Sequence, residues 1–192
     1  ASVFDSEDAE HMERTLLALA HPADAGALRS FLCSLYGGLD AEGLLRLEDD
    51  DSAWDDHARR VRACAELFVK RGFTQALRRL CAAYRVEERM LERPDGLRRL
   101  TNLNHLLEIL AEVSLSERLG PLGLLRWLKS AREDAAVRGD WAFESHELRL
   151  ESSETAVHLT TVHKSKGLEY PIVYCPFLFK PAQLRTEEKA LV

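Results

Sequence analysis

The chain has 192 residues, of which 46% are hydrophobic and 30% charged, a composition typical of a globular protein with a substantial core. No apolar run approaches the roughly 20 residues that a membrane-spanning helix requires. The N-terminus shows no basic segment followed by an apolar one. We therefore expect neither a membrane span nor a secretory signal.

The formal net charge of −6 is unevenly distributed. Residues 1–56 hold 14 acidic and 3 basic side chains, a net charge of −11, whereas residues 57–138 hold 17 basic and 10 acidic, a net charge of +7. Overall acidity does not exclude nucleic acid, because binding depends on where the positive charge lies. Two uses remain open for the arginine pairs of the basic region: contact with duplex DNA phosphates, or solvated helix faces that meet the acidic segment or other subunits. These pairs are Arg59-Arg60, Arg78-Arg79 and Arg98-Arg99.

Helical patterns begin at the N-terminus. A first helix is predicted over residues 6–20, with Asp5 or Ser6 as its N-cap, and a second over residues 24–35, ended by Gly37-Gly38. The acidic run at residues 48–51 is predicted to be a solvated loop that leads into a third helix.

The third helix is predicted to start after Asp51 or Ser52 and to end at Gly72. Its apolar residues recur at steps of three and four, which places them on one buried face. They are Trp54, Ala58, Val61, Ala65 and Phe68. A fourth helix is predicted over residues 74–84, with Leu77, Leu80 and Cys81 turned inward.

Two further helices are predicted after a turn at residues 93–96, over residues 97–113 and 121–137. The apolar stripe of the first consists of Leu100, Leu103, Leu107, Leu110 and Val113. The three tryptophans are interpreted as core anchors and not as platforms for stacked bases. They are Trp54, Trp127 and Trp141.

The four cysteines form no C-x-x-C pair. Cys33, Cys64 and Cys81 lie within apolar helical patterns, whereas Cys175 lies near the C-terminus. We expect buried free thiols and a reducing, cytoplasmic environment.

The pattern changes after residue 150. Residues 156–162 and 171–175 are short and rich in β-branched side chains, which predicts two strands, the second buried on both faces. The fold class is therefore mainly α, a helical unit followed by the beginning of an α/β element. Because residue 192 comes before such an element could complete a sheet, we expect the chain to be a piece of a longer protein.

Chemically distinctive residues separate the two predicted strands. His163, Lys164 and Lys166 suit a phosphate backbone, Gly167 permits a close approach, and Glu169 can accept hydrogen bonds from a sugar hydroxyl. Ligands of open α/β sheets sit at the carboxyl ends of strands, where these groups would project. The residues alone fit a lysine-bearing surface turn equally well.

The stretch LTTVHKSKGLEYPIV, residues 159–173, resembles motif V of the UvrD-like superfamily 1 helicases, whose core is T-x-H-x-x-K-G-L-E. Six such matches are expected by chance at fewer than about one in 10⁶ positions. ELRLESSETAVHL (147–159) and LRRLTNLNHLLEILAE (97–112) resemble the RecB branch, the beta subunits of exodeoxyribonuclease V. Residues 3–29 resemble the motif IVa region of the same family.

This resemblance implies a domain organisation. Residues 1–24 would end the first segment of the RecA-like 2A domain, residues 25–150 would form a helical 2B-like subdomain, and residues 151–192 would return into 2A with motif V. Carried over by position, Thr161 and His163 would contact a DNA strand.

The resemblance also implies roles in nucleotide binding. Glu169 would contact the ATP ribose and Gly167 would shape the turn, while Lys166 matches the motif lysine. ATP and Mg²⁺ would bind the parent protein and not this fragment, because the fragment lacks a G-x-x-x-x-G-K-[ST] phosphate loop. For the same reason we expect no catalytic residues in the fragment. The remaining histidines show no metal-ligand spacing, and no metal is expected.

The implied partners are DNA and the gamma and alpha subunits of exodeoxyribonuclease V. The parent would be an ATP-dependent helicase and exonuclease in double-strand break repair and recombination, and the fragment alone would be inert. Two alternatives stay open: a UvrD-type or AddA-type helicase, or a non-enzymatic module that docks partner subunits.

Overall fold

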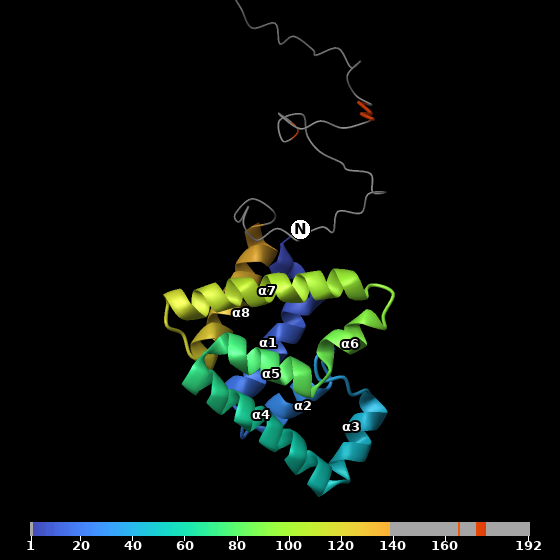
Figure 1. Cartoon of the computed structure of the whole chain (residues 1–192), viewed down its shortest axis with the longest axis vertical. Helices are drawn as coiled ribbons and strands as arrows, with labels where there is room; N and C mark the ends of the chain where they lie inside the picture. Colours follow the sequence, from blue (N-terminus) through green and yellow to red (C-terminus); the bar gives the residue numbers. More distant parts are fainter. Residues whose placement is uncertain (1, 139–164, 166–171, 176–192) are drawn as a thin grey trace, which may run out of the picture. The chain divides into compact units, whose positions relative to one another are not determined.

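The computed structural model describes residues 2–138, 165 and 172–175. The chain divides into two units, Ala1–Ser152 and Ser153–Val192, and nearly all described residues belong to the first. That unit is helical (Figure 1). Its described elements are η1 (Val3–Asp5), α1 (Glu7–Ala20), α2 (Ala25–Leu32), α3 (Ala41–Glu48), α4 (Asp51–Arg71), α5 (Phe73–Ala83), α6 (Val86–Leu91), α7 (Gly96–Ser116) and α8 (Pro121–Arg138).

Four of these helices begin at a side chain that accepts a hydrogen bond from the backbone of the first turn. Ser6 Oγ accepts from the Ala9 N–H at 3.2 Å and starts α1, as predicted. Asp24, Asp40 and Asp50 cap α2, α3 and α4 in the same way. Each such cap contributes about 1 kcal/mol of stability. The cap of α4 lies one residue before the predicted one.

Helix α1 occupies the centre of the unit. It packs against η1, α2, α4, α7 and α8, and Figure 1 shows it running through the middle of the bundle beneath α7. Its side chains Met12, Leu16 and Leu19 are fully buried. Around them lie the other large core residues, which include Phe4, Phe31, Leu32, Tyr36, Leu77, Leu80, Met90, Leu103 and Leu106. The N-terminal helix is therefore the hub on which the later helices assemble.

The buried faces largely follow the predicted periodicity. On α4 the predicted residues Val61, Ala65 and Phe68 are buried, and Trp54 packs against the core as predicted. On α5 the predicted inward residues are also buried. The stripe of α7 is rotated from the prediction, because Leu106 and Ile109 are buried while the predicted residues Leu100, Leu107 and Val113 are only partly covered.

Two short helices were not predicted, α3 and α6. Helix α3 occupies eight residues between the Gly37-Gly38 turn and the acidic run, and only Leu47 of its side chains is buried. Helix α6 has six residues and follows Arg85, whose φ of 48° is left-handed. Neither helix is long enough to repeat an apolar pattern, which is what the prediction relied on.

The turn after α2 is fixed by a distant arginine. Gly38 has a φ of +80°, and a Cβ there would overlap the guanidinium of Arg89 from α6. Arg89 Nη2 donates to the carbonyl oxygens of Leu35 at 3.0 Å and Tyr36 at 2.7 Å. Glycine is favoured at position 38 by its left-handed backbone, and a side chain there would also displace the Arg89 guanidinium from these two carbonyl groups.

The cysteines and tryptophans follow their predicted burial only in part. Cys64 and Cys81 are buried free thiols as predicted, but Cys33 is exposed because it caps the C-terminal end of α2. Trp127 packs its edge against Phe4, with ring centroids 5.8 Å apart, in agreement with its role as a core anchor. Trp141 lies outside the described residues.

The predicted strands are not confirmed. Residues 172–175 form neither strand nor helix, and Ile172, Val173 and Tyr174 are 86%, 64% and 91% exposed, so the expected burial on both faces is wrong for this segment. A strand requires a neighbour for its ladder hydrogen bonds, and the described residues supply none. The other predicted strand, residues 156–162, lies outside the described part. The mainly α class is confirmed.

None of the helices in the described part combines the length and the hydropathy needed to cross a bilayer.

Candidate functional site

The residues predicted to bind nucleotide and DNA lie outside the described part of the chain. They are Thr161, His163, Lys164, Lys166, Gly167 and Glu169. Within that run only Ser165 is described, as a half-buried turn residue. Their roles therefore stay predictions, and the geometry of the first unit must be considered separately.

One arginine of the predicted pairs, Arg99, is largely buried and forms ion pairs within the folded unit. The guanidinium of Arg99, at the start of α7, meets Glu7 at 2.7 Å, Asp8 at 3.2 Å and Asp95 at 2.6 Å. Its side chain is only 15% exposed and that of Asp8 only 3%. Asp8 also accepts a hydrogen bond from Asn102 Nδ2 at 2.8 Å. Arg99 therefore joins α7 to the acidic N-terminal segment and is not available to a phosphate.

The charges of this network support one another. The hydrogen bond from Arg99, with its positive charge, lowers the pKa of Glu7 and of Asp95. Burial alone would lower the pKa of Arg99, but the hydrogen bonds to Glu7 and Asp95 and the charge of Asp8 outweigh it and raise that pKa. Tyr36, in the turn after α2, donates its hydroxyl to the Asp8 carbonyl oxygen at 3.1 Å, which ties that turn to the same point.

A second contact joins the acidic segment to the basic region. Glu13 of α1 pairs with Arg132 of α8, and Lys129 Nζ lies 3.7 Å from the same carboxylate. Among the predicted arginine pairs, contact with the acidic segment 1–56 is seen for Arg99, and Lys129 and Arg132 of α8 make a similar contact.

The other arginines of the predicted pairs are exposed. Arg59 pairs with Asp56 of its own helix. No carboxylate partner exists among the described residues for the remaining four, which are Arg60, Arg78, Arg79 and Arg98. Within the described part of the chain, these four cations are therefore available to a ligand.

A histidine and a tyrosine lie beside Arg60 between α4 and α5. His57 Nδ1 is 3.1 Å from the Tyr84 hydroxyl, and their rings are stacked with centroids 5.6 Å apart. Burial, assisted by the charge of Arg60, lowers the pKa of His57. Burial also raises the pKa of Tyr84 to about 12. The pair is thus neutral near pH 7 and serves packing. In the part of the chain that is described, no group of three or more His, Cys, Asp or Glu is placed to hold a metal.

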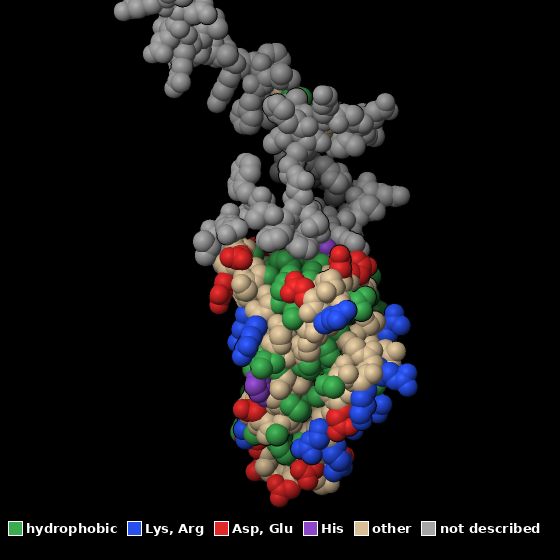
Figure 2. Space-filling model, turned by 90° about the vertical axis from the view of Figure 1, so that its left-hand side faces the viewer, with side chains coloured by type: hydrophobic (Ala, Val, Ile, Leu, Met, Phe, Trp, Pro, Cys, Tyr) green, Lys and Arg blue, Asp and Glu red, His purple; other side chains and the backbone are tan. Residues whose placement is uncertain are grey.

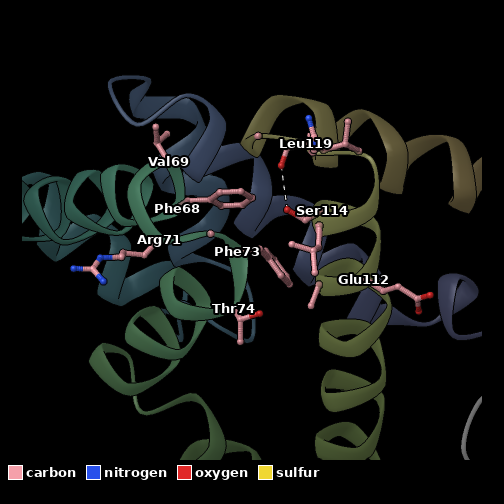
Figure 3. Close-up of a pocket in the computed structure, with 13 residues that line it drawn as sticks. Phe68, Val69, Arg71, Phe73, Thr74, Glu112, Ser114 and Leu119 are labelled. Atoms are coloured by element: carbon pink, nitrogen blue, oxygen red, sulfur yellow. Dashed lines mark hydrogen bonds between the residues drawn. The ribbon is translucent and has the colours of Figure 1, made fainter.

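A cavity of about 570 Å³ opens where the junction of α4 and α5 faces the junction of α7 and α8. Figure 3 shows Phe68 and Phe73 directed into the space between α5 and α7, while Arg71 and Glu112 point outward on opposite sides. The turn after α7 is held by the Ser114 hydroxyl, which donates to the Leu119 carbonyl oxygen at 3.0 Å.

The same end of the unit faces the viewer in Figure 2. Hydrophobic side chains gather along the middle of this face, and both basic and acidic side chains lie at its edges. Val69 and Leu115, which line the cavity, are 77% and 82% exposed. The face is therefore apolar at its centre and carries charges of both signs at its margins.

Sequence reasoning missed this cavity, although a signal for it exists. Val69 lies off the buried stripe of α4, and Leu115 lies two residues beyond the last predicted stripe residue of α7. Apolar side chains off the core-facing stripe of a helix indicate a second apolar surface. Both lie beside a helix end, where two chain segments turn.

Comparison with known families agrees with the resemblance seen in the sequence. The UvrD-like helicase C-terminal domain matches residues 55–182, about two thirds of the chain. The chain therefore belongs to the family of UvrD-like helicase C-terminal domains.

Individual relatives narrow the type to UvrD/RecB. The RecBCD enzyme subunit RecB of Escherichia coli K12 is 34% identical over 98% of this chain and 15% of its own length. The corresponding subunit of Haemophilus influenzae Rd is 30% identical over 95% of this chain and 14% of its own length, and that of Mycobacterium tuberculosis H37Rv is 34% identical over 92% and 15%. The predicted UvrD/RecB-type resemblance is confirmed, and the chain spans about 15% of the length of these relatives.

Proposed function

We propose that this chain is part of an ATP-dependent DNA helicase and exonuclease subunit that acts in double-strand break repair and recombination. The observation that carries this proposal is the similarity to RecB subunits over 92–98% of the chain, which includes the motif V stretch. In this arrangement residues 1–24 end the first 2A segment, residues 25–150 form the 2B-like subdomain, and residues 151–192 return into the RecA-like 2A domain. Residues 156–162 and 171–175 would become strands only within the complete 2A domain of the parent protein, where neighbouring strands supply the ladder hydrogen bonds.

Motif V couples the state of the nucleotide to the grip on DNA. Thr161 and His163 contact the single strand, and the lysines at positions 164 and 166 neutralise its phosphates. Glu169 accepts a hydrogen bond from the ATP ribose, with Gly167 shaping the turn between the two sets of contacts. Because both ligands bind one short segment, a change at the nucleotide shifts the residues that hold the strand.

Alone, the 192 residues are inert. A phosphate loop and the Mg²⁺-binding carboxylate that accompanies it are absent from the sequence, so ATP and Mg²⁺ bind elsewhere in the parent protein. The expected result for the isolated chain is no DNA-stimulated ATP hydrolysis. Turnover by the purified chain, retained through successive purification steps, would contradict this part of the proposal.

Substitutions in the full-length parent protein test the motif. We expect Glu169→Gln to raise the KM for ATP, because a neutral amide oxygen accepts a weaker hydrogen bond than a carboxylate. We expect His163→Ala to raise the DNA concentration required for half-maximal ATPase stimulation, because it removes a hydrogen bond. Each increase should be about tenfold, since hydrogen bonds to charged groups contribute about 1.5–3 kcal/mol. Glu133→Gln, an exposed residue of α8, is the matched control. If both motif variants keep the wild-type KM for ATP and the wild-type DNA concentration for half-maximal stimulation, the assignment of this segment as motif V is overturned.

The exposed arginines support a second contact, with duplex DNA. Arg60, Arg78 and Arg79 have no carboxylate partner among the described residues, so each can displace counterions from a phosphate. Replacing all three by alanine is expected to lower the slope of log K against log salt by about one for each phosphate that is no longer bound. Arg85→Ala, which removes a cation already paired with Glu88, is the control. An unchanged slope in the triple variant would rule out this contact.

Assembly with other subunits is the remaining element of the proposal. The three relatives are named as subunits of the RecBCD enzyme, and we propose that the parent protein likewise associates with gamma and alpha subunits. Co-purification of the parent with those subunits, followed by removal of residues 25–150, tests whether the helical unit contributes to the assembly.

A further inference from the structure

The cavity at the α4–α5 and α7–α8 junctions is an apolar surface that the described residues leave uncovered. Its floor is formed by Phe68, Phe73 and Leu119, and the highly exposed Val69 and Leu115 extend the apolar surface outward. A volume of about 570 Å³ is large enough to take side chains of a bound segment. Exposed apolar surface of this kind is typical of binding sites on soluble proteins.

The rim of this cavity favours a negatively charged ligand. Arg71 and Arg118 line it, are exposed, and lack a carboxylate partner in the described part of the chain. Glu112 is the single carboxylate among the lining residues. The lining therefore carries a net positive charge around an apolar floor.

Two helices also begin at this rim without a side-chain cap. Helix α5 starts after Gly72, which makes no side-chain cap hydrogen bond, and α8 starts after Gly120. Glycine has no side chain with which to accept from the first-turn N–H groups, so an acceptor from outside can take that place. The positive end of each helix dipole adds to the field of the two arginines.

Carboxylates of the chain's own acidic segment are engaged at other places. Glu7 and Asp8 bind Arg99, Glu13 binds Arg132, and Glu48 binds Arg29. These four carboxylates are thus held away from the cavity rim, and the two arginines of the rim have no acidic partner in the described part of the chain.

We propose that this cavity is a docking site for an acidic, amphipathic segment of a partner protein. Apolar side chains of the segment enter between Phe68 and Phe73 on one side and Leu115 on the other, while its carboxylates face Arg71, Arg118 and the open N-termini of α5 and α8. Duplex DNA fits less well, because its bases are stacked inside and its phosphate backbone would leave the apolar floor exposed to water. The inference goes beyond the proposed helicase function and requires neither ATP nor DNA.

Peptide binding to the full 192-residue chain tests the proposal. The probe is a fluorescein-labelled helical peptide of about 16 residues, with leucines on one face and glutamates on the other. A second peptide carries lysine in place of every glutamate, and a third has the acidic sequence scrambled to remove the apolar face. Fluorescence anisotropy is expected to show that the acidic amphipathic peptide binds at least about tenfold more tightly than either control, and less tightly as salt is raised.

Variants locate the site. Leu115→Asp and Arg71→Glu are each expected to weaken binding of the acidic peptide by about tenfold, because the first removes apolar surface and the second reverses a charge. Leu45→Asp on α3 and Arg62→Glu on α4 make the same chemical changes at exposed positions that do not line the cavity, and are expected to stay within about twofold of wild type. Thermal unfolding of all four variants shows whether the fold is intact.

Several outcomes would overturn the proposal. Equal binding of the acidic and lysine peptides would remove its electrostatic basis, and equal weakening in the control variants would place the binding elsewhere. Concentration-dependent self-association abolished by Leu115→Asp would assign the cavity to a second copy of the chain. Duplex DNA that competes fully with the peptide would assign it to a nucleic acid. Tighter peptide binding after removal of residues 139–192 would identify the occupant as the chain's own C-terminal part.

Discussion

The two ends of α7 carry arginines in opposite circumstances. At the N-terminal end Arg99 is surrounded by three carboxylates and is largely buried. At the other end Arg118 is exposed beside an apolar cavity and has no described carboxylate partner. The difference lies in the neighbours, because only the N-terminal end of α7 meets the acidic segment of the chain. One end of the helix thus serves folding, whereas the other is left available for binding.

The largest effect on stability is expected for the carboxylates around Arg99, at the N-terminal end of α7. Asp8→Ala would leave Arg99 and Asn102 without their shared buried partner, and we expect the free energy of unfolding to fall by about 3 kcal/mol. Glu7→Ala removes a partner of the same guanidinium whose side chain is 73% exposed, and should cost less than about 1 kcal/mol. Urea denaturation measures both. Equal decreases in the two variants would show that the buried carboxylate of Asp8 contributes no more to stability than the exposed carboxylate of Glu7.

The glycines that flank α7 give the next largest contrast. A Cβ at Gly96 would overlap the carbonyl oxygen of Met90, whereas a Cβ at Gly120 would meet no atom within 4 Å. Gly96→Ala is therefore expected to lower the free energy of unfolding by roughly 2 kcal/mol, and Gly120→Ala by less than about 1 kcal/mol. A stable Gly96→Ala variant would mean that the turn before α7 can shift.

A gain in stability is expected at the binding end. Arg118 has a φ of 54°, a left-handed conformation that glycine adopts without strain. Arg118→Gly should raise the free energy of unfolding by about 1 kcal/mol while it removes a cation from the cavity rim. Arg62→Gly, within α4, should instead lower it by about 1 kcal/mol. If Arg118→Gly raises the free energy of unfolding and weakens peptide binding, the arginine at this position serves binding and not stability.

The smallest expected effect is a decrease in stability at acid pH, and it is expected to arise from His11 on α1. Burial lowers the pKa of His11 on α1 below its ordinary value of 6.5, so the folded state binds this proton less readily than the unfolded chain. The contribution of His11 to the free energy of unfolding is therefore fully present above about pH 6.5. It decreases as the pH falls towards the pKa of His11 in the folded state, by less than about 1.4 kcal/mol per pH unit. His11→Gln should flatten this dependence, whereas exposed His21→Gln should not. The Glu7 and Asp95 carboxylates add a further decrease only at lower pH, because Arg99 lowers their pKa.

Much of the helical architecture could be predicted from the sequence because it is encoded locally. Ser6 marked the start of α1, Gly72 the boundary between α4 and α5, and the spacing of apolar residues the buried face of α4. Helices α3 and α6 were missed because they are too short to show a period. Cys33 was wrongly expected to be buried, since its pattern continued beyond the last residue of α2.

The division of the arginine pairs could not be predicted. Arg98 and Arg99 are adjacent and chemically identical, yet only Arg99 reaches Glu7 and Asp8, more than 90 residues earlier in the chain. The cavity depends in the same way on two helix junctions that come together only in the folded unit. The motif V residues show the reverse situation, because their pattern is distinctive in the sequence while they lie outside the described residues.

The central position of α1 has a practical consequence for the boundaries of an expressed segment. Similarity to the helicase domain begins at residue 55, inside α4, yet Met12, Leu16 and Leu19 fill the middle of the unit. A protein produced from residues 55–182 alone would expose the apolar faces of α7 and α8 and should aggregate when synthesised. Supplying residues 2–50 as a separate polypeptide should restore solubility if the two pieces recombine around that helix.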